Sequence, residues 1–175
     1  MTDNIVVCIT ATPKSVLETF SFCTINEIPL HCIPRHYENK EEIYYSNLTL
    51  LLKNLKAGQR GIVYIERVAE ILKYKKILDD RGIKTAALWS KNNEEYPLSS
   101  DQIKIREAII HSREMPEYID VLFLNKSCET SISIGDEERT KYPLDFMIVH
   151  HSDKDTQIQV RGRYRNDLNK LYLQA

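Results

Sequence analysis

The architecture of this chain can be read from residues 61–88, GIVYIERVAEILKYKKILDDRGIKTAAL. The first five residues form an uninterrupted apolar run, which is typical of a strand buried on both faces. Residues 67–81 predict a helix, and Gly82 follows it as glycine commonly follows a helix end. Residues 84–88 predict the next strand, so the order strand, helix, strand indicates a parallel pair. The apolar side chains that we expect to face inward from the helix are Val68, Ile71, Leu72 and Leu78.

The rest of the chain continues this alternation. Ser99 and Gln102 have the spacing of a capping box at the start of a helix. The elements that the pattern predicts are a helix at 100–112, strands at 118–124, 146–149 and 171–173, and a short helix capped by Ser152 with Asp155. The strand at 118–124 is expected to be central because, apart from Asp120, it is an apolar run. This order indicates a three-layer α/β fold, in which helices cover both faces of a parallel sheet.

The first third of the chain is predicted less regularly. Residues 5–9 predict a strand, and Thr12 would cap a short helix at about 13–20 that begins with a proline. Asn39 is expected to cap a second helix that carries Tyr44 and Tyr45 and reaches about residue 56. Its apolar face would be formed by Ile43, Leu48, Leu51, Leu52 and Leu55, with Glu41 and Glu42 in its first turn.

Composition limits the classes of function. The chain has 175 residues, of which 42% are hydrophobic and 28% are charged, and its formal net charge is −1. Such a chain has no overall attraction for nucleic acid, so any such binding must come from a local patch. Its four cysteines form no C-x-x-C pair, which disfavours zinc and favours an intracellular, cytoplasmic protein. No apolar run approaches the roughly 20 residues of a membrane helix, so we expect no membrane partner.

Residues 157–166, QIQVRGRYRN, carry three arginines within five positions and one glycine among them. On a short helix, Gln157, Val160 and Tyr164 would face inward and the arginines outward. Arginine is always charged, and its planar fork of donors suits phosphate. The glycine would let the backbone approach a bulky anion or change direction. The alternative interpretation is a solvated basic helix end without a ligand.

Other polar stretches follow the predicted strands and should meet, with the arginines, at one edge of the sheet, where ligands of such folds bind. Hydroxyl, amide and amine groups bind phosphates of a nucleic-acid backbone without reading sequence, which makes Ser90, Asn125 and Lys126 candidate contacts. Trp89 could stack on a base, although core packing is the commoner role of such a residue. His150 and His151 are adjacent, so they should point to opposite sides and form no metal site.

Several catalytic patterns are absent from the sequence. It contains no G-x-x-x-x-G-K-[ST] loop, no G-x-G-x-x-G and no G-x-S-x-G turn. The chain therefore has no phosphate-binding loop of its own. An arginine supplied from outside a nucleotide pocket can still stabilise the transition state of phosphoryl transfer, because it acts through position and charge alone.

The order of these pieces resembles the second RecA-like domain of superfamily-2 helicases, the group that includes the DEAD and DEAH types. Residues 159–165, QVRGRYR, resemble motif VI, a Q-x-x-G-R-x-x-R pattern. Residues 120–125 and 129–134, DVLFLN and ETSISI, resemble motif V. Residues 10–13 also resemble motif III, residues 61–65 occupy the place of motif IV, and residues 146–153 resemble the strand and turn before motif VI.

The resemblance implies roles for individual residues. Arg163 and Arg165 would stabilise the γ-phosphate of ATP, and Gln159 would contact the nucleotide or the first domain. Further roles are nucleotide binding for Gly162, Glu129 and Ser133, and coupling of hydrolysis to strand movement for Thr10, Ala11 and Thr12. ATP and Mg²⁺ would serve the intact parent, whose P-loop and Mg²⁺ ligands would lie on a first domain upstream.

The chain departs from the family pattern in both motifs. Motif V opens with Asn125 instead of threonine, and Ser131 and Ser133 replace its glycine and its acidic or amide residue. The last arginine of motif VI is expected at Asn166, whereas Arg165 stands one position early. On a helix that shift turns a side chain by about 100°. Arg163 is therefore the better candidate for an arginine finger.

We expect residues 1–36 to be the tail of a first RecA-like domain with its linker, and residues 37–175 to be the second domain of a helicase or translocase. The chain would be cut from a longer protein and inactive alone, and its partners would be DNA or RNA and the missing first domain. A non-catalytic RecA-like module that binds nucleic acid or protein is the main alternative, favoured by the departures in motif V. A flavodoxin-like nucleotide-binding domain is disfavoured because the chain has no glycine-rich loop.

Overall fold

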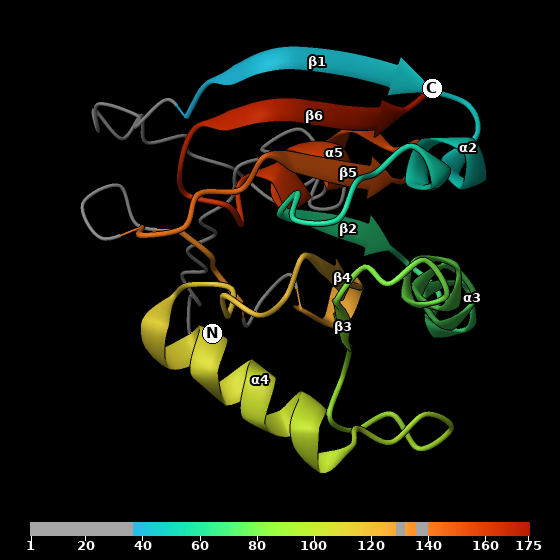
Figure 1. The fold of residues 1–175 in the computed structure, drawn as a ribbon, viewed down its shortest axis with the longest axis vertical. Helices are drawn as coiled ribbons and strands as arrows, with labels where there is room; N and C mark the ends of the chain where they lie inside the picture. The colour runs from blue at the N-terminus through green and yellow to red at the C-terminus, as the bar shows by residue number, and fades with distance from the viewer. Residues whose placement is uncertain (1–36, 129–131, 136–139) are drawn as a thin grey trace, which may run out of the picture. The chain divides into compact units, whose positions relative to one another are not determined.

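Figure 1 shows the fold in a computed structural model, which describes residues 37–128, 132–135 and 140–175. Six strands of this part form one sheet in the order β1-β6-β5-β2-β4-β3, and every strand pair is parallel. The predicted parallel α/β class is therefore confirmed. The main elements are β1 (Asn39–Tyr45), α2 (Leu48–Lys53), β2 (Gly61–Ile65), α3 (Val68–Asp79), β3 (Thr85–Leu88), α4 (Ser100–Ser112), β4 (Val121–Leu124), β5 (Phe146–His150), α5 (Lys154–Arg161) and β6 (Leu168–Gln174).

The two faces of the sheet are covered by different helices. Every residue of β2 is buried, and its side chains alternate between two hydrophobic clusters. Ile62 and Tyr64 belong to the cluster that holds the buried apolar residues of α4 and α5. Val63 and Ile65 belong to the other, with those of α2 and α3. This division gives the three layers that the sequence predicts.

A glycine begins β2 because an aromatic ring occupies the space beside it. Gly61 pairs with Phe146 of β5. A Cβ atom added to Gly61 would lie 2.4 Å from two atoms of the Phe146 ring, well inside van der Waals contact. The central strand pair therefore excludes any side chain at position 61.

The side chain of Gln102 links helix α4 to the edge strand β3 by a hydrogen bond. The predicted capping box is present: the Ser99 hydroxyl accepts from the Gln102 backbone amide at 3.2 Å, and the Gln102 side-chain Oε1 atom accepts from the Ser99 backbone amide at 3.0 Å. The Gln102 Nε2 group also donates to the Ala87 carbonyl at 2.6 Å. Because β3 pairs only with β4 among the described strands, Gln102 satisfies an acceptor that the open edge would otherwise expose.

The predicted helix from Asn39 to about residue 56 is wrong in its first half. Asn39–Tyr45 is a strand paired with β6, so Tyr44 and Tyr45 lie on a strand, and α2 begins only after Asn47, whose side chain accepts from the Leu50 amide at 3.0 Å. The reason is the distant partner: β6 supplies backbone hydrogen bonds that no local pattern reveals. The apolar positions from Leu48 onward do lie on a helix.

Two smaller predictions also fail. Leu72 was expected to face inward from α3, but its side chain is 39% exposed, beside the open edge at β3. The N-cap of α5 is Asp153, one residue after the expected Ser152, and its carboxylate accepts from the Thr156 amide at 2.8 Å. The Thr156 hydroxyl, which also donates to this carboxylate at 2.7 Å, and the Thr156 amide lower the pKa of Asp153. A carboxylate suits a helix N-terminus better than a hydroxyl because it also interacts with the helix dipole.

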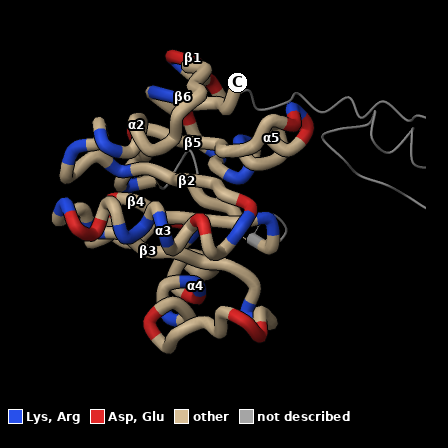
Figure 2. Tube along the Cα trace, turned by 90° about the vertical axis from the view of Figure 1, so that its right-hand side faces the viewer, with Lys and Arg blue, Asp and Glu red and all other residues tan. Residues whose placement is uncertain are grey.

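Charges are spread over the described fold. Figure 2 shows Lys and Arg interspersed with Asp and Glu, in keeping with the net charge of −1. None of the helices in the described residues has the length and apolar composition that crossing a membrane requires.

We predict that Gly61→Ala lowers the free energy of unfolding by about 1–3 kcal/mol, the usual effect of overfilling a packed core. Chemical denaturation measures the change. Gly162→Ala is the matched control, because a Cβ there would meet only carbonyl oxygens of Ile158 and Gln159 at 3.4 and 3.5 Å. Equal stability of the two variants would contradict the assigned contact between Gly61 and Phe146.

Candidate functional site

The arginine-rich stretch is held in place by the inward face of α5. Gln157 and Val160 are buried on the helix, and Tyr164 is fully buried just beyond it, so the predicted inward face is confirmed. The Gln157 Nε2 group donates to the carbonyls of His151 (2.7 Å) and Gln174 (3.2 Å). These contacts tie α5 to the carboxyl ends of β5 and β6.

Beyond α5, residues 162–167 form a turn that leads into β6; we call it the arginine turn. Its backbone pairs with the segment predicted to be motif V. The Ile134 amide donates to the Arg163 carbonyl at 2.7 Å, and the Arg165 amide donates to the Ile134 carbonyl at 2.7 Å. Ile134 and Tyr164 thus form an isolated parallel bridge. Two segments that the sequence singled out separately lie against each other.

Gly135 allows Ile134 to pair with the arginine turn. The sequence patterns did not single out this glycine. Its φ is +91°, in the region that favours glycine. A Cβ atom would lie 3.2 Å from the Arg165 carbonyl carbon and 3.2 Å from the Tyr164 ring. The Gly135 amide also donates to the Arg113 carbonyl at 2.7 Å, which anchors the segment to the end of α4. The only available signal was a glycine directly after the apolar-polar run 132–134.

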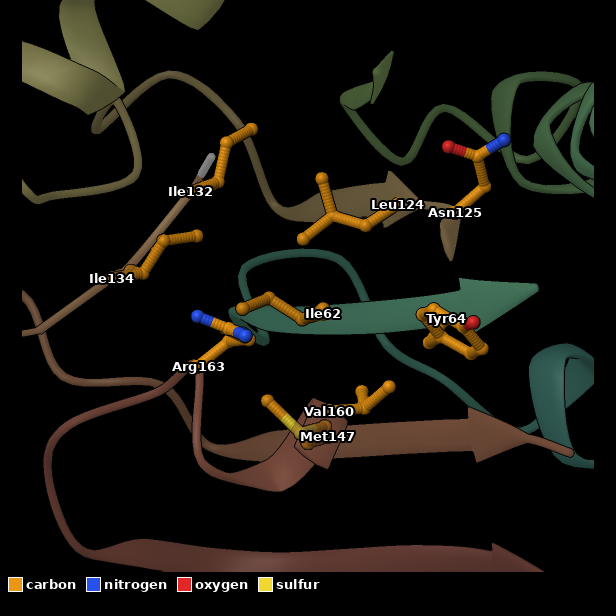
Figure 3. A pocket seen from close by; sticks show the side chains of 9 residues that line it. All are labelled: Ile62, Tyr64, Leu124, Asn125, Ile132, Ile134, Met147, Val160 and Arg163. Atoms are coloured by element: carbon orange, nitrogen blue, oxygen red, sulfur yellow. The ribbon is translucent and has the colours of Figure 1, made fainter. Parts of the chain in front are cut away.

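A small cavity lies between this segment and the sheet (Figure 3). Its volume is about 20 Å³, room for about one water molecule. Arg163 reaches into it beside Ile62, and Asn125 lies at the other end beside Tyr64. The Arg163 Nε atom is buried and has no hydrogen-bond partner among the described residues. The remaining lining residues are Leu124, Ile132, Ile134, Met147 and Val160.

The three arginines occupy different environments, so the expectation that all point outward is wrong. Arg161 is half-buried and hydrogen-bonded to nearby oxygen atoms. Burial lowers its pKa, although arginine stays charged at any ordinary pH. Arg163 is half-buried at the cavity, and Arg165 is exposed. Of the three arginines, Arg161 makes contacts within the domain, Arg163 lines the cavity and Arg165 is exposed.

The arginine turn does not share an edge of the sheet with the other candidate residues. Because α5 runs back along the sheet from β5, the turn lies by the start of β6, where Leu168 pairs with Asn39 of β1. Ser90 and Asn125 instead follow the carboxyl ends of β3 and β4. The prediction that the arginines share this edge is therefore wrong, although Asn125 and Arg163 line the same cavity.

The other predicted site residues are placed as follows. Lys126 is exposed. The side-chain Oδ1 atom of Asn125 accepts from the Ser127 hydroxyl at 2.5 Å, and the Ser90 hydroxyl accepts from the Asn92 backbone amide at 3.2 Å. Gln159 is half-buried on α5, and the Ser133 hydroxyl oxygen is buried without a partner among the described residues. Outside the described residues lie Glu129, Thr10, Ala11 and Thr12.

Two other predicted features take structural roles. Trp89 is buried and donates to the Tyr96 carbonyl at 2.6 Å, which supports core packing over base stacking. Gly162 has helical φ (−64°) and is exposed, so neither the backbone conformation nor any neighbouring group requires glycine there. A requirement for glycine at 162 would have to come from a ligand that approaches the backbone closely.

Aromatic and imidazole groups gather at the carboxyl end of β5. The Tyr45 hydroxyl lies 3.0 Å from Nδ1 of His150, and the Tyr74 ring meets His150 edge-on at 6.4 Å. Burial lowers the pKa of His150. The His151 Nε2 atom lies 3.8 Å from a carboxylate oxygen of Glu66. In the part of the chain that the structure describes, no group of three or more His, Cys, Asp or Glu side chains could hold a metal ion.

Comparisons with known proteins do not establish a family for this chain. No protein family matches the sequence, and no curated protein matches it. Among solved structures, the fold is similar to a chain in the crystal structure of the E. coli DEAD-box protein SrmB bound to regulator of ribonuclease activity A. The two share 18% identity at a TM-score of 0.47, over 80% of this chain and 79% of that chain. Function therefore has to be inferred from the site itself.

We predict that Gly135→Ala separates the two paired segments. It should lower the free energy of unfolding by about 1–2 kcal/mol, because alanine resists positive φ, and speed hydrogen exchange of the Arg165 amide. Gly82→Ala is the matched control, since Gly82 also has positive φ (+75°) but no atom within 4 Å of its added Cβ. The control should lose similar stability and keep Arg165 protected. Unchanged Arg165 exchange in Gly135→Ala would refute this role of the glycine.

Proposed function

We propose that this chain is the second RecA-like domain of an ATP-dependent superfamily-2 helicase or translocase. The observation that supports this best is the pairing of Ile134 with Arg163 and Arg165. Motif order alone can arise by chance in an α/β chain. A backbone contact between the segments that resemble motifs V and VI is an independent reason to regard them as one site.

In this proposal the arginine turn acts on a nucleotide held by another domain. Arg163 would stabilise the charge that develops on the γ-phosphoryl group, which requires position and charge but no nucleophile. The buried Nε atom and the apolar cavity walls restrict where its guanidinium can lie. Arg165 is exposed and would add a second positive charge to the same anion.

The remainder of the ATP site would come from a P-loop domain, because this sequence has no phosphate-binding loop. Mg²⁺ binds ATP in such sites through carboxylates and phosphates. No cluster of carboxylates or histidines among the described residues fits that ion. Its protein ligands, like the phosphate-binding loop, would therefore belong to the P-loop domain.

The strand of DNA or RNA would lie at the carboxyl ends of β3 and β4. Ser90 and Lys126 stand there, and hydroxyl and amine groups bind phosphates without reading sequence. The near-neutral charge implies that this domain alone binds a strand weakly, with affinity that falls as salt rises.

A non-catalytic binding module is the second candidate. Burial of the Arg163 Nε atom beside apolar groups favours it, because an arginine held inside the domain could serve the fold alone. The two candidates differ in whether loss of the guanidinium abolishes hydrolysis.

We predict that Arg163→Ala lowers ATP hydrolysis about a thousandfold, the scale expected for loss of an arginine finger. The measurement is nucleic-acid-stimulated phosphate release by a protein in which this chain is joined to its P-loop domain. Lys76→Ala is the control, because Lys76 is exposed on α3, on the other face of the sheet.

Two results would overturn the proposal. Hydrolysis by Arg163→Ala at the rate of the Lys76→Ala control would make the arginine turn structural and favour the binding module. The absence of any P-loop domain that acts with this chain would also exclude the ATP site. The chain by itself should release no phosphate from ATP, and enzyme-like turnover by it would equally refute this reading.

A further inference from the structure

Arg161, the last residue of α5, is directed toward the start of β1. Its Nε group donates to Oδ1 of Asn39. Its terminal nitrogens donate to the carbonyl oxygens of Tyr164 (2.7 Å), Asn166 (3.0 Å) and Glu38 (3.4 Å). One side chain therefore joins the arginine turn to the residues at which β1 begins.

Other hydrogen bonds also join the arginine turn to residues 38–39 at the start of β1; we call this contact the junction. The Asp167 carboxylate accepts from the Glu38 amide at 2.9 Å, and the Leu168 amide donates to the Glu38 carbonyl at 2.9 Å. The Asn39 Nδ2 group donates to Glu42 at 2.8 Å, which leaves Oδ1 to accept from Arg161. The junction is thus built from both sides, by the turn and by the edge strand.

The Arg161 guanidinium already interacts with groups of its own domain. Carbonyl oxygens surround its donors, its guanidinium lies 5.8 Å from the centre of the Tyr164 ring, and the carboxylates of Asp167 and Glu42 are near. Arginine suits this place because its planar fork reaches several acceptors at once, which a single ammonium cannot do. The charges left for an anion are those of Arg163 and Arg165.

We infer that Arg161 is a positioning residue: it fastens the arginine turn to β1 and so sets where Arg163 and Arg165 stand relative to a phosphate. The inference rests on the proposed function of that turn. Among the described strands, β1 is an edge strand that pairs only with β6, so a shift of β1 disturbs a single strand pair. If residues 38–39 moved, the hydrogen bonds of the Arg161 guanidinium would move the arginine turn with them.

The first test uses the chain alone and measures hydrogen exchange. In Arg161→Gln, the Arg165 and Leu168 amides should exchange at least about tenfold faster, because loss of charged hydrogen bonds lets the junction open locally. Arg81→Gln is the matched control: Arg81 makes a similar contact elsewhere, donating to the carbonyls of Leu52 and Leu55 at 2.7 Å each. It should leave both amides protected. Equal protection in the two variants overturns the inference.

The second test measures hydrolysis by the protein that joins this chain to its P-loop domain. Misplacement of a catalytic group by about 1 Å can lower a rate about a hundredfold, so kcat of Arg161→Gln should fall on that scale with KM little changed. Arg161→Lys should fail to restore kcat. Asn39→Ala, which removes one acceptor and leaves the turn's sequence intact, should give a smaller loss in a folded protein. Arg81→Gln should hydrolyse ATP normally.

Arg163→Ala separates failure of this inference from failure of the proposed function. If Arg163→Ala loses hydrolysis while Arg161→Gln and Asn39→Ala keep it, the positioning role is refuted and the function stands. If Arg163→Ala keeps full hydrolysis, the function fails and the positioning role fails with it. If Arg161→Gln does not fold, Asn39→Ala decides: kcat equal to that of Arg81→Gln overturns the inference.

Discussion

Burial of β2 on both faces is the constraint on which the rest of the structure depends. Each of its residues, from Gly61 to Ile65, is buried between neighbours on either side. The alternation of its side chains separates α2 and α3 from α4 and α5. One of those faces also forms the floor of the cavity that Arg163 enters beside Ile62. The strand that organises the layers therefore also positions the candidate site.

The arginine turn illustrates how one residue type takes different roles through its surroundings. Arg161 donates to oxygen atoms of its own domain, Arg163 is half-buried at an apolar cavity, and Arg165 is exposed. A buried guanidinium nitrogen without a partner costs free energy unless water or a ligand satisfies it. Among the described residues the Nε atoms of both Arg163 and Arg60 are such groups, so burial of Arg163 by itself does not separate a catalytic role from a structural one.

Much of the fold could be predicted from local patterns, and the larger misses share one physical cause. The apolar runs of β2, β4 and β5 and the capping box at Ser99 are local, and each is confirmed. The strand β1 was mistaken for a helix because its partner, β6, lies at the other end of the chain. Likewise, the contact of Gly135 with the arginine turn, the link from Arg161 to Asn39, and the distance between the turn and the carboxyl ends of the strands depend on tertiary packing.

The most direct test of the central claim is a crystal structure of this chain joined to the P-loop domain that we propose for it, with ADP and tetrafluoroaluminate in place of the transferred phosphoryl group. The account predicts that the Arg163 guanidinium lies within hydrogen-bonding distance of the fluoride ligands, about 2.7–3.1 Å. Arg161 should still contact Asn39 in that structure. An Arg163 side chain that stays in the cavity beside Ile62, away from the bound anion, would contradict the account.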